Sequence, residues 1–320
     1  MNQEPEIIKG ASLWRDAWRR LLKNKLAVFG LVILALMVVA VAIGPPLIRW
    51  TTGLTADYIP ADGDLIKSFP PSSEHWMGTD EAGRDMLARV LQGGRISLMV
   101  GIISTIVSLI VGVSYGAIAG YLGGRIDNLM MRIVDIIYAI PYILIVIVLL
   151  SVFGGPNTPS WIQWFSERFG GAGNQGLSQI FLLFFALGLV SWLTMARVVR
   201  GQILSLKNQE FVLAAKATGV STFGIIFRHL VPNALGPVIV YATLTVPSVM
   251  LTEAFLSYLG LGVQAPYASW GSLAADGVKN IAIFPWQLIF PGVTMALTLF
   301  SLNFLGDGLR DALDPQTRKF

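Results

Sequence analysis

Two acidic side chains stand inside long apolar stretches of this sequence, and they are the residues best suited to chemistry there. Asp135 lies just inside one stretch, and Glu253 lies near the end of another. An ionisable group in an apolar environment is costly, and such acids relay protons or bind cationic groups. Because Arg132 precedes Asp135 by three residues, we expect these two to form an ion pair. Glu253 could bind a substrate amino group or make structural contacts near an interface.

Enzymatic chemistry has few residues to work with. The sequence contains no cysteine, and His75 and His229 are its only histidines, which argues against a metal site or a thiolate nucleophile. No apolar stretch contains a histidine or lysine that could activate a serine or threonine. A Gly-x-x-x-x-Gly-Lys-Ser/Thr phosphate loop is absent, and so is any Gly-Lys pair. We therefore predict a non-catalytic chain that itself binds no cofactor and no metal.

The composition is that of a membrane protein. Hydrophobic residues make up 54% of the 320 residues and charged residues 13%, against roughly 25% charged in an ordinary soluble domain. A hydrocarbon core about 30 Å thick is crossed by roughly 20 apolar residues in a helix. Six stretches meet this requirement, so we predict an all-α, polytopic membrane protein with six transmembrane helices. The predicted spans cover residues 26–48, 97–121, 133–153, 177–196, 234–259 and 281–306.

The basic residues determine the expected topology. The net charge is +4, but the Lys and Arg residues lie mainly between the apolar stretches, so we expect no nucleic-acid binding. Most of these residues are cytoplasmic if both termini are cytoplasmic, as the positive-inside rule favours. Segment 1–25 is then a cytoplasmic amphipathic helix leading into a retained signal anchor. Residues 49–96 form a long extracytoplasmic loop, and residues 308–320 form a cytoplasmic tail.

The end of the extracytoplasmic loop predicts a short interfacial helix before the second span. Thr79 or Asp80 could cap this helix at its N-terminus. Asp85 and Arg89 lie four residues apart, a spacing that brings opposite charges together on one helix face.

Three glycines recur at intervals of four in the second span. A helix face without side chains allows another backbone to approach closely. The helix that packs there could belong to this chain or to another subunit. These glycines are Gly112, Gly116 and Gly120.

The segment between the fourth and fifth predicted spans, residues 197–233, is neither a tight turn nor a span. Its sequence predicts two short helices, the first ending at Gly219 in a left-handed conformation. Ser221 or Thr222 could cap the second helix, and Pro232 is expected to end it. Two helices with a glycine corner would project from the membrane as a small, rigid elbow that another protein could bind.

This segment resembles the coupling loop, called the EAA loop, of binding-protein-dependent ABC importer permeases. The likeness consists of an Ala-Ala pair, a glycine four residues after its second alanine, and a Pro-Asn pair before the next span. The family's glutamate position is occupied by Leu213, and the nearest acid is Glu210. The resemblance implies that this cytoplasmic coupling-helix loop inserts into a cleft of a separate ATPase. The implied coupling residues are Glu210, Phe211, Leu213, Ala214, Ala215, Lys216, Gly219 and Pro232.

Further short motifs narrow the resemblance to the peptide and nickel branch of these permeases, and within it to C-type subunits of oligopeptide permeases. The resemblance implies a subunit of the bacterial inner membrane that forms half of the translocation pathway of an ATP-driven importer of oligopeptides or dipeptides. Residues 97–307 would form the permease core, and Glu253 is a candidate for the pathway. The motifs cover residues 14–17, 78–85, 93–98, 255–262, 269–271 and 306–315.

The same resemblance implies a set of partners. They are a homologous B-type permease subunit, two ATP-binding subunits that use ATP and Mg, and an extracytoplasmic peptide-binding protein, all acting at the lipid bilayer. Hydrolysis would then take place only in the ATP-binding subunits. The cargo stays open between peptides of different length and nickel chelates.

An ion-coupled secondary transporter that works without ATPase subunits is the main alternative. Such a protein often has ionisable residues or broken helices near the middle of the membrane, or an internal repeat. The predicted spans show none of these features, which favours the importer subunit.

Overall fold

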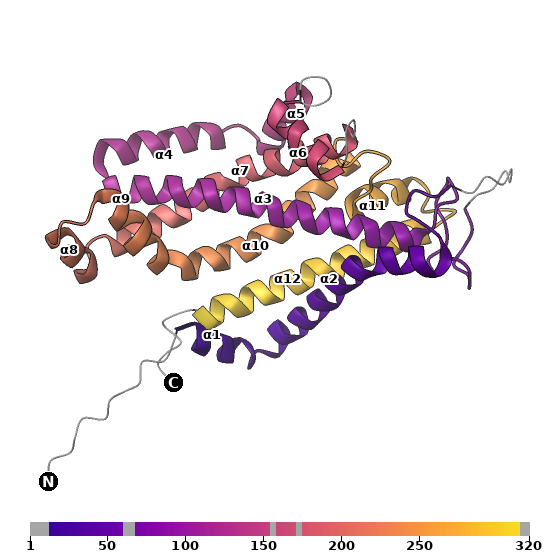
Figure 1. The fold of residues 1–320 in the computed structure, drawn as a ribbon, viewed down its shortest axis with the longest axis horizontal. Coiled ribbons are helices and arrows are strands. Elements are labelled where there is room, and N and C mark those ends of the chain that lie inside the picture. Colours follow the sequence, from indigo (N-terminus) through magenta and orange to yellow (C-terminus); the bar gives the residue numbers. More distant parts are fainter. Residues whose placement is uncertain (1–12, 60–67, 154–157, 171–174, 314–320) are drawn as a thin grey trace, which may run out of the picture.

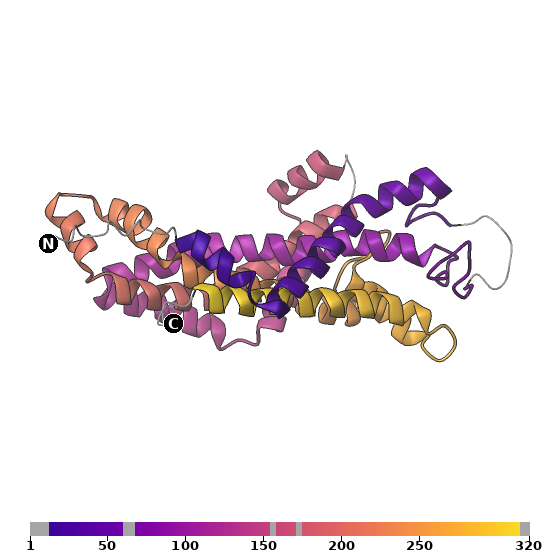
Figure 2. The ribbon, with the colours of Figure 1, turned by 90° about the horizontal axis from the view of Figure 1, so that it is seen from below.

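The computed structural model describes residues 13–59, 68–153, 158–170 and 175–313, and these residues form helices and no β-strand. The helices build an elongated bundle, in which most of the long ones run nearly along its length (Figures 1 and 2). They are α1 (Leu13–Leu21), α2 (Lys25–Thr52), α3 (Met86–Leu122), α4 (Gly124–Tyr138), α5 (Tyr142–Phe153), α6 (Ser160–Gly170), α7 (Gln175–Leu206), α8 (Glu210–Ala217), α9 (Thr222–Gly224), the π-helix η2 (Ile225–Leu230), α10 (Val231–Tyr258), α11 (Trp270–Lys279) and α12 (Trp286–Leu313).

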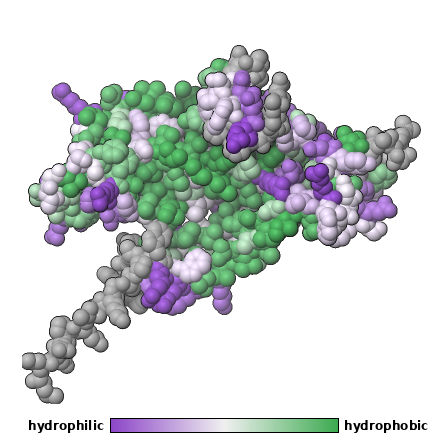
Figure 3. Space-filling model, viewed as in Figure 1, coloured by the Kyte–Doolittle hydropathy of each residue, from purple (hydrophilic) through white to green (hydrophobic). Residues whose placement is uncertain are grey.

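Five of the predicted spans correspond to helices that are long and apolar enough to cross a membrane. On the face seen in Figure 3, apolar side chains cover much of the middle of the bundle and many hydrophilic residues lie toward its ends, as expected for a protein surrounded by lipid. The prediction of a mostly helical, polytopic membrane protein is therefore confirmed. The five helices cover Lys25–Thr52, Met86–Leu122, Ser178–Leu206, Thr222–Tyr258 and Trp286–Leu313.

The predicted third span, residues 133–153, is not one straight helix. It is divided between α4 and α5, which are bent by 82° relative to each other. Pro141 has no amide hydrogen to donate into a helix, and its ring disfavours helical backbone at Ile140 before it. The expectation that no span is broken is therefore wrong here. The described part of the chain has five spans, or six if the bent pair counts as one.

Helix α2 continues through two consecutive prolines because a side chain from α3 replaces their missing amides. Pro45 and Pro46 cannot donate to the carbonyls four residues earlier, those of Val41 and Ala42. The Arg95 guanidinium donates to both, from Nε to the Val41 oxygen at 2.8 Å and from Nη2 to the Ala42 oxygen at 2.7 Å. Arg95 therefore ties α3 to α2 while satisfying the carbonyls that the prolines leave free.

The glycines of the second span face α7 of the same chain. A Cβ atom added to Gly112 would lie 2.6 Å from Met195 Cβ, and one added to Gly120 would lie 3.0 Å from the Arg200 carbonyl oxygen. Only glycine allows the two backbones to approach so closely. The glycine face therefore packs against a helix of the same chain, which was one of the two predicted alternatives.

The segment before α3 differs from the prediction. Asp85 caps α3 by accepting from the Ala88 amide at 2.8 Å, so neither Thr79 nor Asp80 is the cap. Arg89 forms its ion pair with Asp80 rather than with Asp85. The helix that begins at Met86 is continuous with the second span, so no separate interfacial helix precedes it among residues 68–85. Arg89 pairs with Asp80 because the folded loop brings Asp80 close to it, which sequence spacing does not reveal.

The predicted N-terminal amphipathic helix is present as α1, but its apolar face packs on protein. Ala17 and Leu21 are buried against the end of α12, around Leu309 and Ala312. Trp18 remains half-exposed. Parts of the predicted N-terminal segment (1–12), extracytoplasmic loop (60–67) and C-terminal tail (314–320) lie outside the described residues.

Candidate functional site

The elbow predicted between the fourth and fifth spans is formed by α8, a turn and α9. Gly219 has φ of +78°, a left-handed conformation that other residues rarely adopt, as predicted for the corner. The Val220 amide donates to the Ala215 carbonyl at 3.1 Å and closes the turn. Ser221 accepts from the Gly224 amide at 3.2 Å, so of the two proposed caps it is Ser221 that begins the second helix.

Helix α8 is held by two buried side chains and is otherwise exposed. Val212 and Ala215 pack against Ile225, Ile226 and Leu230 of η2. The remaining coupling residues of α8 and the corner face outward, including Leu213 with 52% of its surface exposed. Ala215 is the predicted coupling residue that is buried within the chain itself. The exposed ones are Glu210, Phe211, Leu213, Ala214, Lys216 and Gly219.

Pro232 does not end the second helix of the elbow, contrary to the prediction. α9, η2 and α10 follow one another without a break, and Pro232 lies in the first turn of α10. A proline in an α-helix clashes with the carbonyl four residues earlier. The wider π-turns of η2 immediately before it can accommodate the ring, and a proline at the start of a helix lacks an amide that would have no partner anyway. The elbow is therefore joined rigidly to α10.

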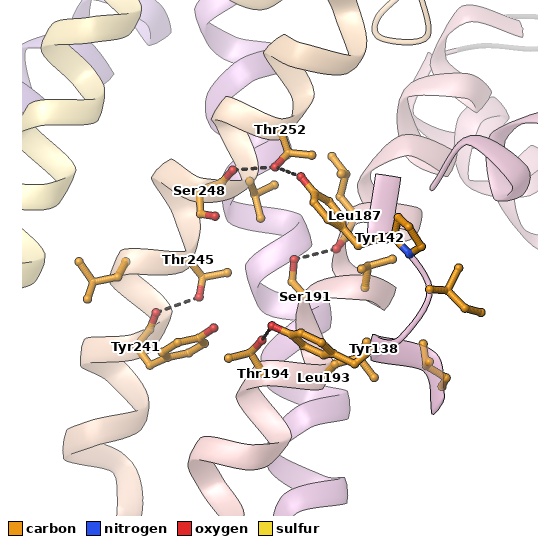
Figure 4. A pocket seen from close by; sticks show the side chains of 16 residues that line it. Tyr138, Tyr142, Leu187, Ser191, Leu193, Thr194, Tyr241, Thr245, Ser248 and Thr252 are labelled. Carbon is orange, nitrogen blue, oxygen red and sulfur yellow. Dashed lines mark hydrogen bonds between the residues drawn. The ribbon is translucent and has the colours of Figure 1, made fainter. Parts of the chain in front are cut away.

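A cavity of about 410 Å³ lies between the α4–α5 break, α7 and α10 (Figure 4). None of the residues that line it is charged. Apolar side chains alternate with the hydroxyl groups of three tyrosines, three threonines and two serines. The hydroxyl-bearing residues are Tyr138, Tyr142, Ser191, Thr194, Tyr241, Thr245, Ser248 and Thr252.

Two tyrosines on either side of the α4–α5 break reach across the cavity. Tyr142 Oη lies 2.7 Å from Thr252 Oγ1 on α10. Tyr138 Oη lies 3.4 Å from Thr194 Oγ1 on α7. The bend at Pro141 is what turns both rings toward the bundle (Figure 4).

Two ion pairs connect α4, the helix before the break, to α7. Asp135 accepts from Arg197 Nη2 at 2.8 Å, so the expected pair with Arg132 is wrong. Asp127 accepts two hydrogen bonds from Arg200, at 2.5 and 2.7 Å. Helix position alone favours Arg132 for Asp135, but the approach of α7 brings a better placed guanidinium.

Glu253 is enclosed by its own chain and does not line the cavity. Only 1% of its surface is exposed. Its Oε1 accepts from Ser257 Oγ and Ser269 Oγ, both at 2.6 Å. Ser269 also caps α11, so the carboxylate links the end of α10 to the start of α11. These contacts are structural, and the role of Glu253 on a transport path stays a prediction.

The hydroxyl groups of the cavity are functional candidates that the sequence did not predict. Their signal was present, because Tyr241, Thr245, Ser248 and Thr252 recur at helical spacing within one apolar span. Ser191 and Thr194 repeat the pattern on α7. Single hydroxyls are common in spans, and only the bend at Pro141 brings the two tyrosines to the same place.

The chain is similar to known families and characterised proteins over nearly its whole length. Residues 112–319 match the family model of the binding-protein-dependent transport system inner membrane component. Residues 12–65 match the N-terminal transmembrane domain of oligopeptide transport permease C. The oligopeptide transport system permease protein OppC of Escherichia coli K12 is 48% identical, covering 97% of this chain and 94% of that protein.

Similar relatives occur in Bacillus subtilis. Its OppC is 44% identical, covering 97% of this chain and 92% of that protein. Its dipeptide transport system permease protein DppC is also 44% identical, covering 99% of this chain and 91% of that protein. A solved inward-facing MetNI methionine ABC transporter shares the fold with a TM-score of 0.50 and 18% identity, covering 72% of this chain and 98% of that one.

Proposed function

Because this chain belongs to the family of binding-protein-dependent transport system inner membrane components and is an ABC importer permease, we propose that it carries oligopeptides or dipeptides. The names of the relatives from Escherichia coli and Bacillus subtilis support this cargo. The proposed complex contains this chain, a homologous B-type permease, two ATP-binding subunits and an extracytoplasmic peptide-binding protein. ATP and Mg act in the ATP-binding subunits, and this chain supplies half of the path.

The mechanism depends on one observation: along the chain, the elbow lies between α7 and α10, two of the helices that line the cavity at the α4–α5 break. α7 provides Ser191 and Thr194 and ends four residues before α8. On the other side, α9 and η2 run directly into α10, which provides Thr245 and Thr252. A displacement of α8 therefore acts on α7 through the short turn at residues 207–209, and on α10 through the Gly219 corner and the continuous run of α9, η2 and α10. In this proposal, closure of the ATP-binding subunits moves α8 and so re-orients the cavity.

The surface of the elbow supports docking to another protein. Leu213 and Phe223 expose apolar side chains, Phe223 with 70% of its surface exposed. Ala214 and Ala217 are small and exposed, so a partner can approach the α8 backbone closely. We therefore assign the ATPase contact to Glu210, Phe211, Leu213, Ala214, Lys216 and Gly219. Ala215 and Pro232 would support their geometry.

The arrangement of the helix ends supports the proposed topology. α1, the C-terminal end of α12 and the elbow all lie toward the same end of the bundle (Figure 1). If the elbow meets cytoplasmic ATPases, both described ends of the chain are cytoplasmic. The segment between α2 and α3 and helix α11 then face the outside of a bacterial inner membrane.

Replacement of Gly219 with proline tests the coupling proposal. A φ of +78° is outside the range of proline, so the corner must change shape. We expect loss of peptide-stimulated ATPase activity and of uptake, with normal membrane insertion. Gly53 also has a positive φ, +72°, so Gly53→Pro is the matched control variant outside the elbow. Normal uptake by the Gly219→Pro complex would contradict the proposal.

The broken span is the feature that favours the alternative, an ion-coupled transporter. Purified chain in liposomes separates the two functions. An ion-coupled transporter moves peptide in response to an ion gradient without ATP-binding subunits. We expect no movement until the partner subunits and ATP are added.

A further inference from the structure

We propose that the cavity at the α4–α5 break binds the main chain of an extended peptide, whose amide hydrogens are accepted by hydroxyl oxygens of α7 and α10. This inference rests on the proposed function and specifies how the path contacts its cargo. The cavity volume of about 410 Å³ is within the range of roughly 300–1,000 Å³ that small-ligand sites occupy.

Ser191 and Thr245 on the cavity wall present acceptors because their hydroxyl protons are already used. Ser191 Oγ donates to the Leu187 carbonyl at 2.8 Å, and Thr245 Oγ1 donates to the Tyr241 carbonyl at 2.8 Å. A hydroxyl has one proton and two lone pairs. Each oxygen can therefore still accept a hydrogen bond, but it has no second proton to donate.

The two hydroxyl groups that meet between α5 and α10 also have no free proton. Thr252 Oγ1 donates to the Ser248 carbonyl at 3.0 Å. The hydrogen bond between Tyr142 and Thr252, 2.7 Å long, must then take its proton from Tyr142. The Tyr142 oxygen is left with lone pairs and no free proton. Main-chain N–H groups are the donors that every peptide offers at regular spacing.

The absence of charge in the lining indicates indifference to side-chain charge. Beside the cavity, Asp135 and Arg197 pair with each other at 2.8 Å, and the Arg197 guanidinium lies 4.3 Å from the centre of the Tyr138 ring. Neither charged group lines the cavity. A charged peptide side chain thus finds no ion-pair partner on the described lining, and recognition falls to the main chain.

The first experiment removes two acceptors and measures uptake. The variant Ser191→Ala/Thr245→Val removes both hydroxyl groups with little change in side-chain size. Its control is Ser114→Ala/Thr243→Val, because these two hydroxyls also donate to helix carbonyls but do not line the cavity. The complete importer in proteoliposomes, with its binding protein and ATP, is supplied with radiolabelled trialanine.

We expect uptake by the cavity variant to fall about fivefold to tenfold, as loss of two hydrogen bonds predicts, and uptake by the control to stay within about twofold. ATPase activity stimulated by the binding protein without peptide should be the same in both, which excludes a folding defect. Equal uptake by the two variants would overturn the cavity assignment.

The second experiment tests access to the cavity. The chain has no cysteine, so Ser248→Cys, with cysteine-free partners, gives a unique thiol on the lining. We expect a charged methanethiosulfonate reagent to block trialanine uptake, and trialanine with binding protein and ATP to slow the labelling. Thr243→Cys is the matched control on α10. Labelling of Ser248→Cys without inhibition would contradict the inference.

Uptake by the wild-type importer distinguishes a failure of the proposed function from a failure of the cavity assignment. If it imports no trialanine with all partners and ATP, the proposed function is wrong and the cavity assignment falls with it. If it imports trialanine but the cavity variants behave as their controls, only the cavity assignment is wrong.

Discussion

The α8 end and the α11 end of the bundle are built in opposite ways. At α11, Ser269 and Ser272 form a capping box, Glu253 accepts two hydrogen bonds, and Trp270 is buried. At α8, Gln209 makes no side-chain cap, and most side chains face outward. Ser269, Ser272 and Glu253 thus have their hydrogen-bond partners within the chain. The α8 end leaves apolar surface and helix amides for another molecule, as a docking element requires.

The largest expected effect tests whether the α11 end carries stability. Trp270 is 1% exposed, and its Nε1 donates to the Val90 carbonyl at 2.8 Å. We expect Trp270→Ala to lower the free energy of unfolding by about 3–5 kcal/mol, as truncation of a buried aromatic does. Phe223→Ala, at the exposed elbow, should cost about 1 kcal/mol or less. Unfolding in detergent measures both, and a larger loss for Phe223 would reverse the comparison.

Glu253 tests whether the α11 end is structural rather than part of the path. Removal of the carboxylate in Glu253→Ala leaves the Ser257 and Ser269 hydroxyls without their acceptor and should cost about 1–3 kcal/mol of stability. Glu253→Gln keeps an acceptor oxygen and should lose less. We expect peptide uptake per folded complex to be unchanged in Glu253→Gln. A selective loss of uptake in that variant would instead support the pathway role.

Leu213 tests whether the α8 end is an interface. In Leu213→Asp, the new carboxylate would be buried without a partner once the elbow docks. This should weaken the free energy of docking by at least about 1.4 kcal/mol, which is a tenfold change in the docking equilibrium. Val278 is an exposed apolar residue on α11, so Val278→Asp is the matched variant at the other end. We expect peptide-stimulated ATPase activity to fall only for Leu213→Asp. Equal activities would remove Leu213 from the interface.

The smallest expected effect sharpens the role of the glycine corner. Gly219 and Gly53 both have positive φ, and a Cβ atom added to either would meet no atom within 4 Å. Alanine at either position should therefore cost about 1 kcal/mol of backbone strain without a steric clash. We expect similar melting temperatures but reduced uptake only for Gly219→Ala. Equal uptake would indicate that the corner tolerates strain without loss of coupling.

Local patterns were enough to predict several parts of this molecule. Apolar runs of about 20 residues predicted five of the spans, because crossing a hydrocarbon core requires that length. The corner at Gly219 also follows from residue type, and so does a cap at Ser221 or Thr222, of which the structure has Ser221, since left-handed backbone and an exposed helix start favour those residue types. Such features depend on the nearest few residues alone.

The errors arose where the conformation of a preceding turn or a contact with a distant residue determines the structure. Pro141 breaks a helix and Pro232 does not, because π-turns precede Pro232. Asp135 pairs with Arg197, which lies 62 residues away in the chain. Local spacing contains no information about either outcome.

The sequence by itself determined the membrane class, most of the long spans and the elbow, because these depend on hydropathy and local backbone preference. Only the tertiary structure decided where the hydroxyls meet, how Arg95 satisfies the carbonyls freed by two prolines, and that Glu253 is enclosed. Each of these requires helices far apart in sequence to approach within hydrogen-bond distance, which packing of the whole bundle sets.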